Sequence, residues 1–261
     1  MATTRLPALK CRRTGLAVII VHHRRLDRSQ QPGDKYLHPD LQMTQLPSPD
    51  RWQDLFASLV ANHAQADAAH DSQHLHRVVA NAYQLTHAEG ADWLVVMPAA
   101  WLHDCVVVPK SSPDRNKASV LAASQAIEWL KAHDWPHGRL DEIAHAIEAH
   151  SFSAGIVPRT LEAKVVQDAD RLDALGAVGL ARTLMLGGQM GRELYSPDDP
   201  LCVGRPPDDS RFSLDHVFAK LLKLEAMMQT PSGKAEAHRR TQFLKAFLNQ
   251  LAGEIGVTES A

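Results

Sequence analysis

The stretch from residue 93 to residue 104, WLVVMPAAWLHD, decides the fold class of this chain. Its apolar run is predicted to form a helix, and the run ends at His103 and Asp104. Two adjacent ionisable side chains on so apolar a helix are costly to bury unless something compensates them. A divalent cation would compensate both, so this stretch predicts a buried helix with metal ligands at its end.

Apolar residues recur at intervals of three and four from Trp52 onward, which is the helical pattern. Alanine and leucine are abundant and aromatic residues make up only 5% of the chain, which favours helices over strands. The best strand candidate is Val106–Pro109, and its proline cuts it short. We therefore predict an all-α fold, a single compact helical bundle, with Gly187-Gly188 ending its sixth helix. The helices are expected at about residues 50–66, 72–88, 92–106, 115–133, 138–151, 158–187, 212–229 and 232–255.

The N-terminal part differs from the rest of the chain. Residues 1–45 are predicted to be a weakly ordered extension, and residues 46–257 one domain. The apolar run Gly15–Val21 is far shorter than the ~20 residues of a transmembrane helix, and it lacks the cleavage site of a signal peptide. Met43 is a plausible true start, a hypothesis that an intact mass of the native protein beginning near residue 1 would remove.

Charge and cysteine content narrow the class of protein. The formal net charge is -2, which is not the basic footprint of a duplex-binding protein. An anionic ligand would therefore have to meet a local cluster of positive charge, or a metal. Cys11, Cys105 and Cys202 lie far apart without any Cys-x-x-Cys, so neither a disulfide framework nor a structural zinc site is expected. We predict a cytoplasmic protein that binds neither duplex nucleic acid nor membrane.

Helical spacing extends the His-Asp pair to more distant residues. His74 and Arg77 begin a predicted helix and share one face, because residues three and four apart lie above one another. Asp170 and Asp173 lie one turn apart in an otherwise apolar helix, whereas Asp168 lies about 200° from Asp170 around the axis. Asp170 is the expected metal ligand and Asp168 the alternative. Mixed imidazole and carboxylate ligands suit transition metals better than Ca²⁺.

Several motifs follow one another in a fixed order along the chain. They are His74-x-x-Arg77-Val78, Leu102-His103-Asp104, Val108-Pro109-Lys110, Ala149–Ser153, Asp168–Arg182, and Lys220–Leu224 with Thr230. This order resembles the HD-domain phosphohydrolase superfamily, and it is most similar to the YedJ-like branch of bacterial hydrolases. The resemblance covers about residues 50–257 and implies the compact helical fold of that superfamily.

The resemblance also implies a metal cofactor. It would be one divalent cation (Mn, Co, Ni, Fe, Zn or Mg), completed by water and held by His74, His103, Asp104 and Asp170. A second metal in this superfamily usually needs further histidines after the His-Asp pair. The nearby options, His145 and His150, lie roughly 140° apart on their helix, so one metal is the better interpretation.

Positive groups would hold an anionic substrate beside such a metal. The candidates are Arg77, Lys110 and Arg115, and His150 could hydrogen-bond the substrate or shuttle a proton. Asp104, His150 and Asp173 are the candidates for catalysis.

One departure from the superfamily concerns the general base. Some nucleotidases and alarmone hydrolases carry a glutamate about four residues after the His-Asp pair, where this chain has Val108. The general base is therefore left open among Asp71, Asp173 and His150, and the substrate is not carried over from those branches.

The predicted function is metal-dependent hydrolysis of a phosphoester or phosphoanhydride bond in a small phosphorylated metabolite. A nucleotide is expected from the habit of the family, and the chain could act as a monomer or a homodimer. Two rivals are a non-catalytic module that binds a nucleotide signal and a di-iron oxygenase on the same kind of scaffold. Tight ligand binding without turnover across many phosphorylated compounds would favour the first rival, and two irons per chain with an oxygen-dependent reaction would favour the second.

Overall fold

The computed structural model describes residues 49–63, 72–108, 112 and 114–257, and the structural statements below concern these residues. Contacts divide the chain into residues 1–46 and 47–261, and the described residues belong to the second unit. The predicted extension over residues 1–45, with Met43, thus lies outside the described residues. The helices are α1 (Pro49–His63), α2 (Ser72–Glu89), α3 (Trp93–Leu102), α4 (Ala118–Ala132), α5 (Leu140–His150), α6 (Leu161–Leu172), α7 (Gly176–Gln189), α8 (Leu222–Leu224) and α9 (Pro231–Glu254).

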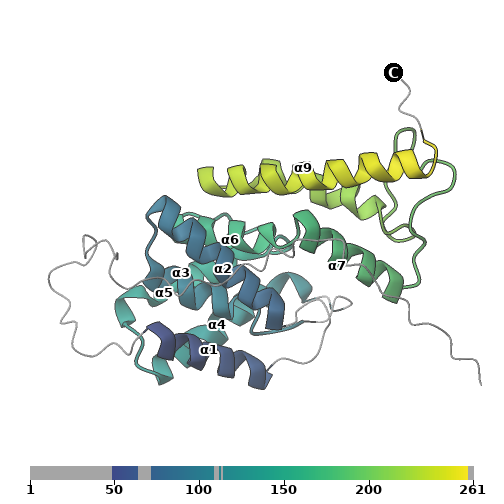
Figure 1. The fold of residues 1–261 in the computed structure, drawn as a ribbon. Coiled ribbons are helices and arrows are strands. Elements are labelled where there is room, and N and C mark those ends of the chain that lie inside the picture. Colours follow the sequence, from purple (N-terminus) through teal and green to yellow (C-terminus); the bar gives the residue numbers. More distant parts are fainter. Residues whose placement is uncertain (1–48, 64–71, 109–111, 113, 258–261) are drawn as a thin grey trace, which may run out of the picture. The chain divides into compact units, whose positions relative to one another are not determined.

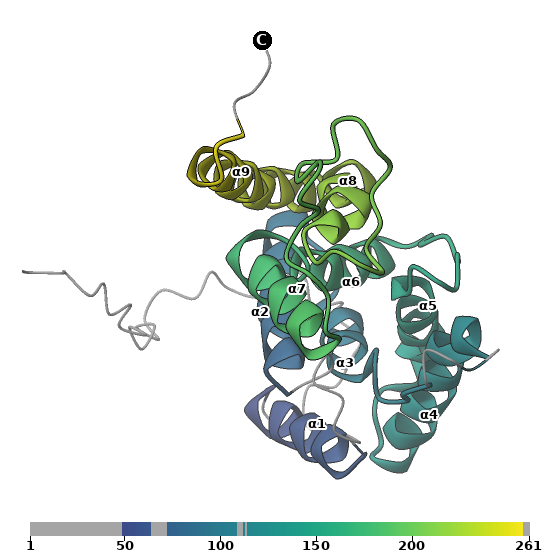
Figure 2. The same cartoon turned by 90° about the vertical axis from the view of Figure 1, so that its right-hand side faces the viewer.

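These helices form the predicted all-α fold, and the described residues contain no strand beyond an isolated bridge between Glu193 and Phe212. In both views α9 lies at the opposite end of the bundle from α1 (Figures 1 and 2). The 3-10 turns η2 (Arg115–Lys117), η3 (His137–Arg139) and η5 (Glu225–Met227) and the π-helical turn η4 (Val217–Leu221) complete the order. None of the described helices combines the length and the apolarity that crossing a membrane requires.

Helix α3 is the centre of the bundle. Every residue from Val95 to Leu102 is buried, as expected of a helix that is apolar on all sides. It packs against α1, α2, α4, α5 and α6. Because α2, α5 and α6 surround the C-terminal end of α3, side chains that point inward from these helices are brought together there.

The predicted helix over residues 158–187 is wrong in one respect, because it is two helices. Helix α6 ends at Leu172, and α7 begins at Gly176, whose φ of +69° is favourable only for glycine. Leu175 between them is buried, so the apolar pattern continues through the break and hides it. The break matters for function, because it places Asp173 at the C-cap of α6.

The predicted end of that helix at Gly187-Gly188 agrees with the structure to within one residue, but Gly187 has another role. Helix α7 continues to Gln189, and a Cβ on Gly187 would lie 1.9 Å from the hydroxyl of Ser213. Gly187 is therefore needed for the close approach of the following loop, and not for helix termination.

Val106–Val108, the best strand candidate within the predicted all-α fold, form no strand, and Pro109 lies outside the described residues. The region expected as a helix over 212–229 is irregular, with the π-helical turn η4, the short α8 and the 3-10 turn η5 in succession. Periodicity could find its apolar residues, such as the buried Leu221 and Leu224, but not the change of helix type.

Candidate metal centre and its cavity

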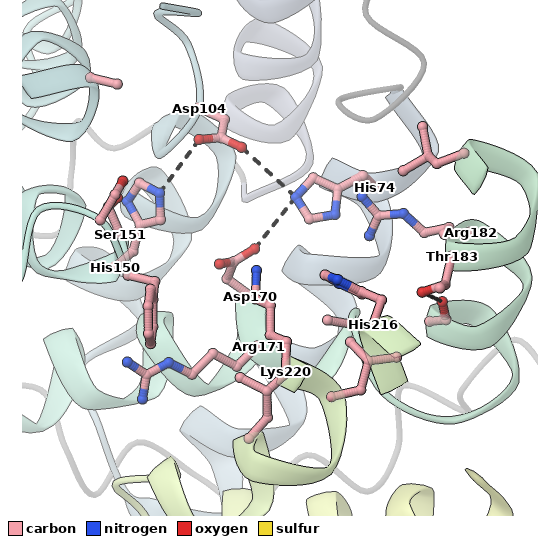
Figure 3. A pocket seen from close by; sticks show the side chains of 18 of the residues that line it. His74, Asp104, His150, Ser151, Asp170, Arg171, Arg182, Thr183, His216 and Lys220 are labelled. Atoms are coloured by element: carbon pink, nitrogen blue, oxygen red, sulfur yellow. Dashed lines mark hydrogen bonds and ion pairs between the residues drawn. The ribbon is translucent and has the colours of Figure 1, made fainter. Parts of the chain in front are cut away.

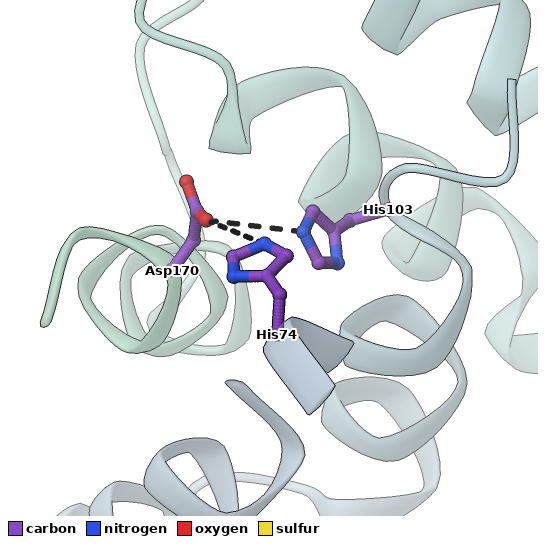
Figure 4. A group of neighbouring side chains, drawn as sticks. All are labelled: His74, His103 and Asp170. Carbon is purple, nitrogen blue, oxygen red and sulfur yellow. Dashed lines mark ion pairs between the residues drawn. The ribbon is translucent and has the colours of Figure 1, made fainter. Parts of the chain in front are cut away.

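The four predicted metal ligands converge. His74 lies in the first turn of α2, His103 and Asp104 follow the last residue of α3, and Asp170 lies in α6. The Nε2 atom of His74 is 3.5 Å from Oδ1 of Asp170, and Nε2 of His103 is 3.9 Å from the same oxygen (Figure 4). Oδ2 of Asp104 is 3.5 Å from Nε2 of His103 and 4.0 Å from Nε2 of His74.

A third imidazole reaches the same cluster. His150 is the last residue of α5, and its Nε2 atom is 3.4 Å from Oδ1 of Asp104 (Figure 3). Its ring centroid lies 4.8 Å from that of His103. The structure thus gathers His150 and the four predicted ligands around a single point.

The Nδ1 atoms fix the orientation of all three rings. Each of them contacts an oxygen that only accepts hydrogen bonds, so Nδ1 must carry the proton and donate it. The distances are 2.7 Å from His74 to Oδ2 of Asp173, 2.9 Å from His103 to the carbonyl of Ala100, and 2.6 Å from His150 to the carbonyl of Ile147. In each neutral ring the lone pair is therefore on Nε2, which faces the carboxylates.

This arrangement needs a positive charge at its centre. Lone pairs of imidazole nitrogens and carboxylate oxygens face one another, and Nε2 of His103 is buried without a hydrogen-bond partner among the described residues. Burial lowers the pKa of His103, which favours the neutral ring. A metal cation would satisfy all of these atoms at once, and imidazole and carboxylate donors without a thiolate would suit Mn²⁺, Fe²⁺, Co²⁺, Ni²⁺ or Zn²⁺.

The pKa values of the other two rings are raised. Burial lowers the pKa of His74, but the hydrogen bond with Asp173 and the charges of Asp170 and Asp104 outweigh it. Burial also lowers the pKa of His150, and Asp104 outweighs it there. Both shifts report the excess of negative charge in the cluster, which is what a cation site requires.

Asp173 supports the cluster from behind. This buried carboxylate accepts from Nδ1 of His74, from Nε of Arg77 at 2.5 Å, and from Nη1 of Arg182 at 2.5 Å. Burial raises the pKa of Asp173, but the hydrogen bonds from His74 and Arg77 outweigh it, so the pKa is lowered. A carboxylate so firmly ionised and so enclosed is suited to orienting His74, not to exchanging protons with a substrate.

Two alternatives from the sequence are placed elsewhere. Asp168 is buried and accepts from the backbone N–H groups of Gln229 and Thr230 and from the Thr230 hydroxyl, so it fixes the chain at the start of α9. His145 accepts from the backbone N–H of Arg159 through Nε2. Neither side chain reaches the metal cluster.

A cavity of about 640 Å³ opens beside the cluster, a size typical of small-molecule sites. His74, Asp104, His150 and Asp170 line it on one side. The cations that line it are Arg115, Arg171, Arg182, Arg192 and Lys220.

Of the predicted substrate-binding residues, some line the cavity and others do not. Arg115 lines the cavity, and its Nη1 donates to the carbonyl of Val108 at 2.7 Å. Arg77 does not line it and points to Asp173. Lys110 and Asp71 lie outside the described residues.

Sequence reasoning missed much of the opposite wall. Arg171 could have been suspected because it follows Asp170, and Lys220 belonged to a recognised motif without a role. Arg182 ended the recognised motif Asp168–Arg182 but was given no role. Arg192 and His216 had no signal, since no regular spacing links them to the ligands. Figure 3 shows His216 and Lys220 on the segment that lies across the cavity from Asp104.

Residues 72–175 match the HD domain family. The uncharacterized protein YpgQ of Bacillus subtilis (strain 168) is 34% identical over 192 residues, which cover 72% of this chain and 85% of YpgQ. The chain belongs to the HD-domain family, as its motifs predicted.

Solved structures agree with this assignment. An HD-superfamily hydrolase from Bacillus thuringiensis is 31% identical, with a TM-score of 0.63 over 80% of this chain and 99% of that one. The Bacillus subtilis YpgQ structure in complex with ADP is 32% identical, with a TM-score of 0.59 over 78% of this chain and 93% of that one. The fold is therefore that of an HD-superfamily hydrolase.

Proposed function

We propose that this protein is a metal-dependent phosphohydrolase that cleaves a P–O bond of a small phosphorylated metabolite, most naturally a nucleotide. One observation carries the proposal. Three imidazoles present their Nε2 lone pairs to two carboxylates at one point, and this point borders a cavity lined with cations.

His74, His103, Asp104 and Asp170 would hold one divalent cation. Two overlapping groups of ligand atoms can be drawn, His74 with His103 and Asp170, and His103 with Asp104 and His150. Both need Nε2 of His103, and its Nδ1 is occupied by a carbonyl, so one ion is favoured over two. When bound, the metal supplies a hydroxide near neutral pH and stabilises charge on the phosphoryl oxygens.

The cations of the cavity would hold and orient the phosphate. The Nε atoms of Arg171 and Arg192 are buried and have no hydrogen-bond partner among the described residues. Buried guanidinium N–H groups without partners are costly, and an anionic oxygen in the cavity could satisfy them. Arg115 and Lys220 would add further positive charge around the reacting group.

Two observations support a nucleotide. Phe152 lines the cavity with 62% of its surface exposed, and Nζ of Lys220 lies 5.9 Å from its ring centroid. An exposed aromatic ring two residues after His150 offers a planar group a stacking surface close to the metal centre. In addition, the related YpgQ has been crystallised with ADP.

The test is a panel of nucleoside mono-, di- and triphosphates and simple phosphate esters, with Mn²⁺, Co²⁺, Ni²⁺, Fe²⁺, Zn²⁺ or Mg²⁺. Phosphate and pyrophosphate are measured separately. We expect turnover of at least one substrate that requires added metal and is lost in Asp104→Ala. Turnover that survives chelator and this substitution would refute the proposal, and tight nucleotide binding without any turnover would favour a regulatory module.

A further inference from the structure

A second histidine-carboxylate pair lies in the same cavity, apart from the metal cluster. His216 and Asp209 both line the cavity, and Nδ1 of His216 is 2.7 Å from Oδ2 of Asp209. A carboxylate only accepts, so Nδ1 donates, and Nε2 is left without a hydrogen-bond partner among the described residues. Figure 3 shows the His216 side chain on the wall facing His74 and Asp170.

The loop that carries Asp209 is held rigidly. Asp215, adjacent to His216, is fully buried and forms an ion pair with the guanidinium of Arg205. The same carboxylate accepts from the backbone N–H of Asp208 at 2.6 Å. Asp208 in turn accepts from the backbone and the hydroxyl of Ser210. The buried carboxylate of Asp215, which precedes His216, thus binds Arg205 and Asp208, which precede Asp209. These contacts fix the positions of His216 and Asp209.

Hydrolysis of a phosphate ester with a basic leaving group needs a proton on the departing oxygen as well as a nucleophile. The imidazoles of His74 and His103 cannot give one, because their Nδ1 protons are held by oxygens and their Nε2 atoms face the ligand point. Nε2 of His150 is directed at Oδ1 of Asp104, 3.4 Å away, and its Nδ1 proton is held by the carbonyl of Ile147. Asp173 is enclosed by its basic partners. Among the described residues that line the cavity, His216 is the one imidazole that lies outside the metal cluster.

We infer that His216 is the general acid, and that Asp209 orients it. The inference rests on the proposed phosphohydrolase function. As water adds to phosphorus, the bond from phosphorus to the leaving oxygen breaks and its electron pair goes to that oxygen. The Nε2–H of the His216 imidazolium transfers its proton to that oxygen and leaves a neutral ring, which regains a proton from solvent. Asp209 keeps the Nδ1–H hydrogen bond throughout, so the ring stays aimed at the cavity.

Leaving groups of different stability provide the test. Phenyl phosphate releases a basic oxyanion that needs a proton, whereas p-nitrophenyl phosphate releases a stabilised anion that departs without one. With the activating metal present, His216→Asn should lower kcat for phenyl phosphate by about 100-fold and kcat for p-nitrophenyl phosphate by less than about fivefold. Asn can still donate to Asp209, so the loop should keep its hydrogen bond. Asp209→Asn should show the same selectivity with a smaller loss.

A similar pair on the surface supplies the matched control. Nδ1 of His238 is 2.8 Å from Oε1 of Glu225, and neither residue lines the cavity. His238→Asn should leave both rates unchanged, and metal affinity and the thermal unfolding midpoint should be the same in all variants.

Equal losses for the two esters in His216→Asn, or no loss for either, would overturn the acid role while leaving the phosphohydrolase intact. Absence of metal-dependent turnover of every panel substrate by the wild-type protein would remove the proposed function, and the acid role with it.

Discussion

The two sides of the cavity are built differently. The ligand cluster, which consists of His74, His103, Asp104 and Asp170, lies on or directly after the regular helices α2, α3 and α6, and both of its imidazoles are buried. The loop wall, residues 190–224, consists of an irregular loop followed by the π-helical turn η4 and α8, and the side chain of His216 on it is 27% exposed. A fixed metal geometry needs rigid supports, whereas contacts to a substrate can be carried by loops.

This structural difference predicts that the ligand cluster binds the metal and that the loop wall binds the substrate. Substitutions in the ligand cluster should remove metal and turnover together. Substitutions in the loop wall should leave the metal bound and change which substrates are held or cleaved. The predictions below test this division, beginning with the largest expected effect.

Asp170→Ala removes one carboxylate from the ligand cluster. We expect turnover to fall by at least ~10³-fold, because the metal contributes several kcal/mol to transition-state stabilisation. Metal affinity, measured by calorimetry, should fall in parallel. Asp198→Ala is the control, since this aspartate is exposed on the loop after α7. A variant that loses activity while binding metal normally would break the assignment of Asp170 as a ligand.

Asp173→Asn tests the support behind the cluster. Loss of its charge leaves the Nδ1 hydrogen bond of His74 weaker and Arg77 and Arg182 without their anion. We expect metal affinity to fall by ~10–100-fold, the usual cost of losing a partner behind a ligand. Competition with a chromogenic chelator would measure it. Unchanged metal affinity would show that Asp173, at the C-cap of α6, does not support the metal ligands.

The same substitution predicts a pH effect in metal-free protein. The pKa of Asp173 is lowered on folding, so its charge stabilises the folded state at pH values above its unfolded pKa of about 4. That contribution is lost as the pH falls from the unfolded pKa of Asp173 toward its lower folded pKa. The wild type should therefore exceed Asp173→Asn in free energy of unfolding at about pH 7, and the difference should shrink at about pH 3. Urea denaturation at both pH values would reveal it, and a constant difference would contradict it.

The contrast between the two sides also explains what the sequence could predict. The HD motifs indicate the fold. Helical spacing predicts that Asp168 and Asp170 point to different sides of their helix, and the structure agrees, because a regular helix has a geometry that is known in advance. The apolar run of α3 predicted a buried helix for the same reason. The break before α7 was missed because buried Leu175 continues the apolar period across it.

The loop wall could not be predicted in this way. His216 meets Asp209 through a turn, and that turn is fixed by Arg205 and the buried Asp215. Such contacts depend on tertiary packing and leave no period in the sequence. Arg77 shows the reverse case. Helical spacing placed it one turn after His74, but it did not reveal that the guanidinium donates to Asp173.

Lys220→Met removes one positive charge from the loop wall. Because a hydrogen bond to a charged group contributes ~1.5–3 kcal/mol, KM for the best substrate should rise about tenfold or more. Metal affinity should stay the same. Lys223→Met, an exposed lysine in α8, is the control and should have no effect. If metal affinity fell with Lys220→Met, the two sides of the cavity would not be independent.

Phe152→Leu should have the smallest effect and tests what the cavity holds beyond phosphate. Leucine keeps an apolar contact but loses the flat ring, and stacking of a base on an aromatic ring contributes ~1–3 kcal/mol, so affinity for a nucleoside monophosphate should fall about fivefold. Affinity for inorganic phosphate should not change, because phosphate has no group to stack. Calorimetry with both ligands in the presence of Mn²⁺ measures the two effects, and Phe243→Leu controls for an exposed ring elsewhere, on α9. Equal losses for phosphate and nucleotide would place Phe152 in the support of His150 and remove the stacking argument for a nucleotide.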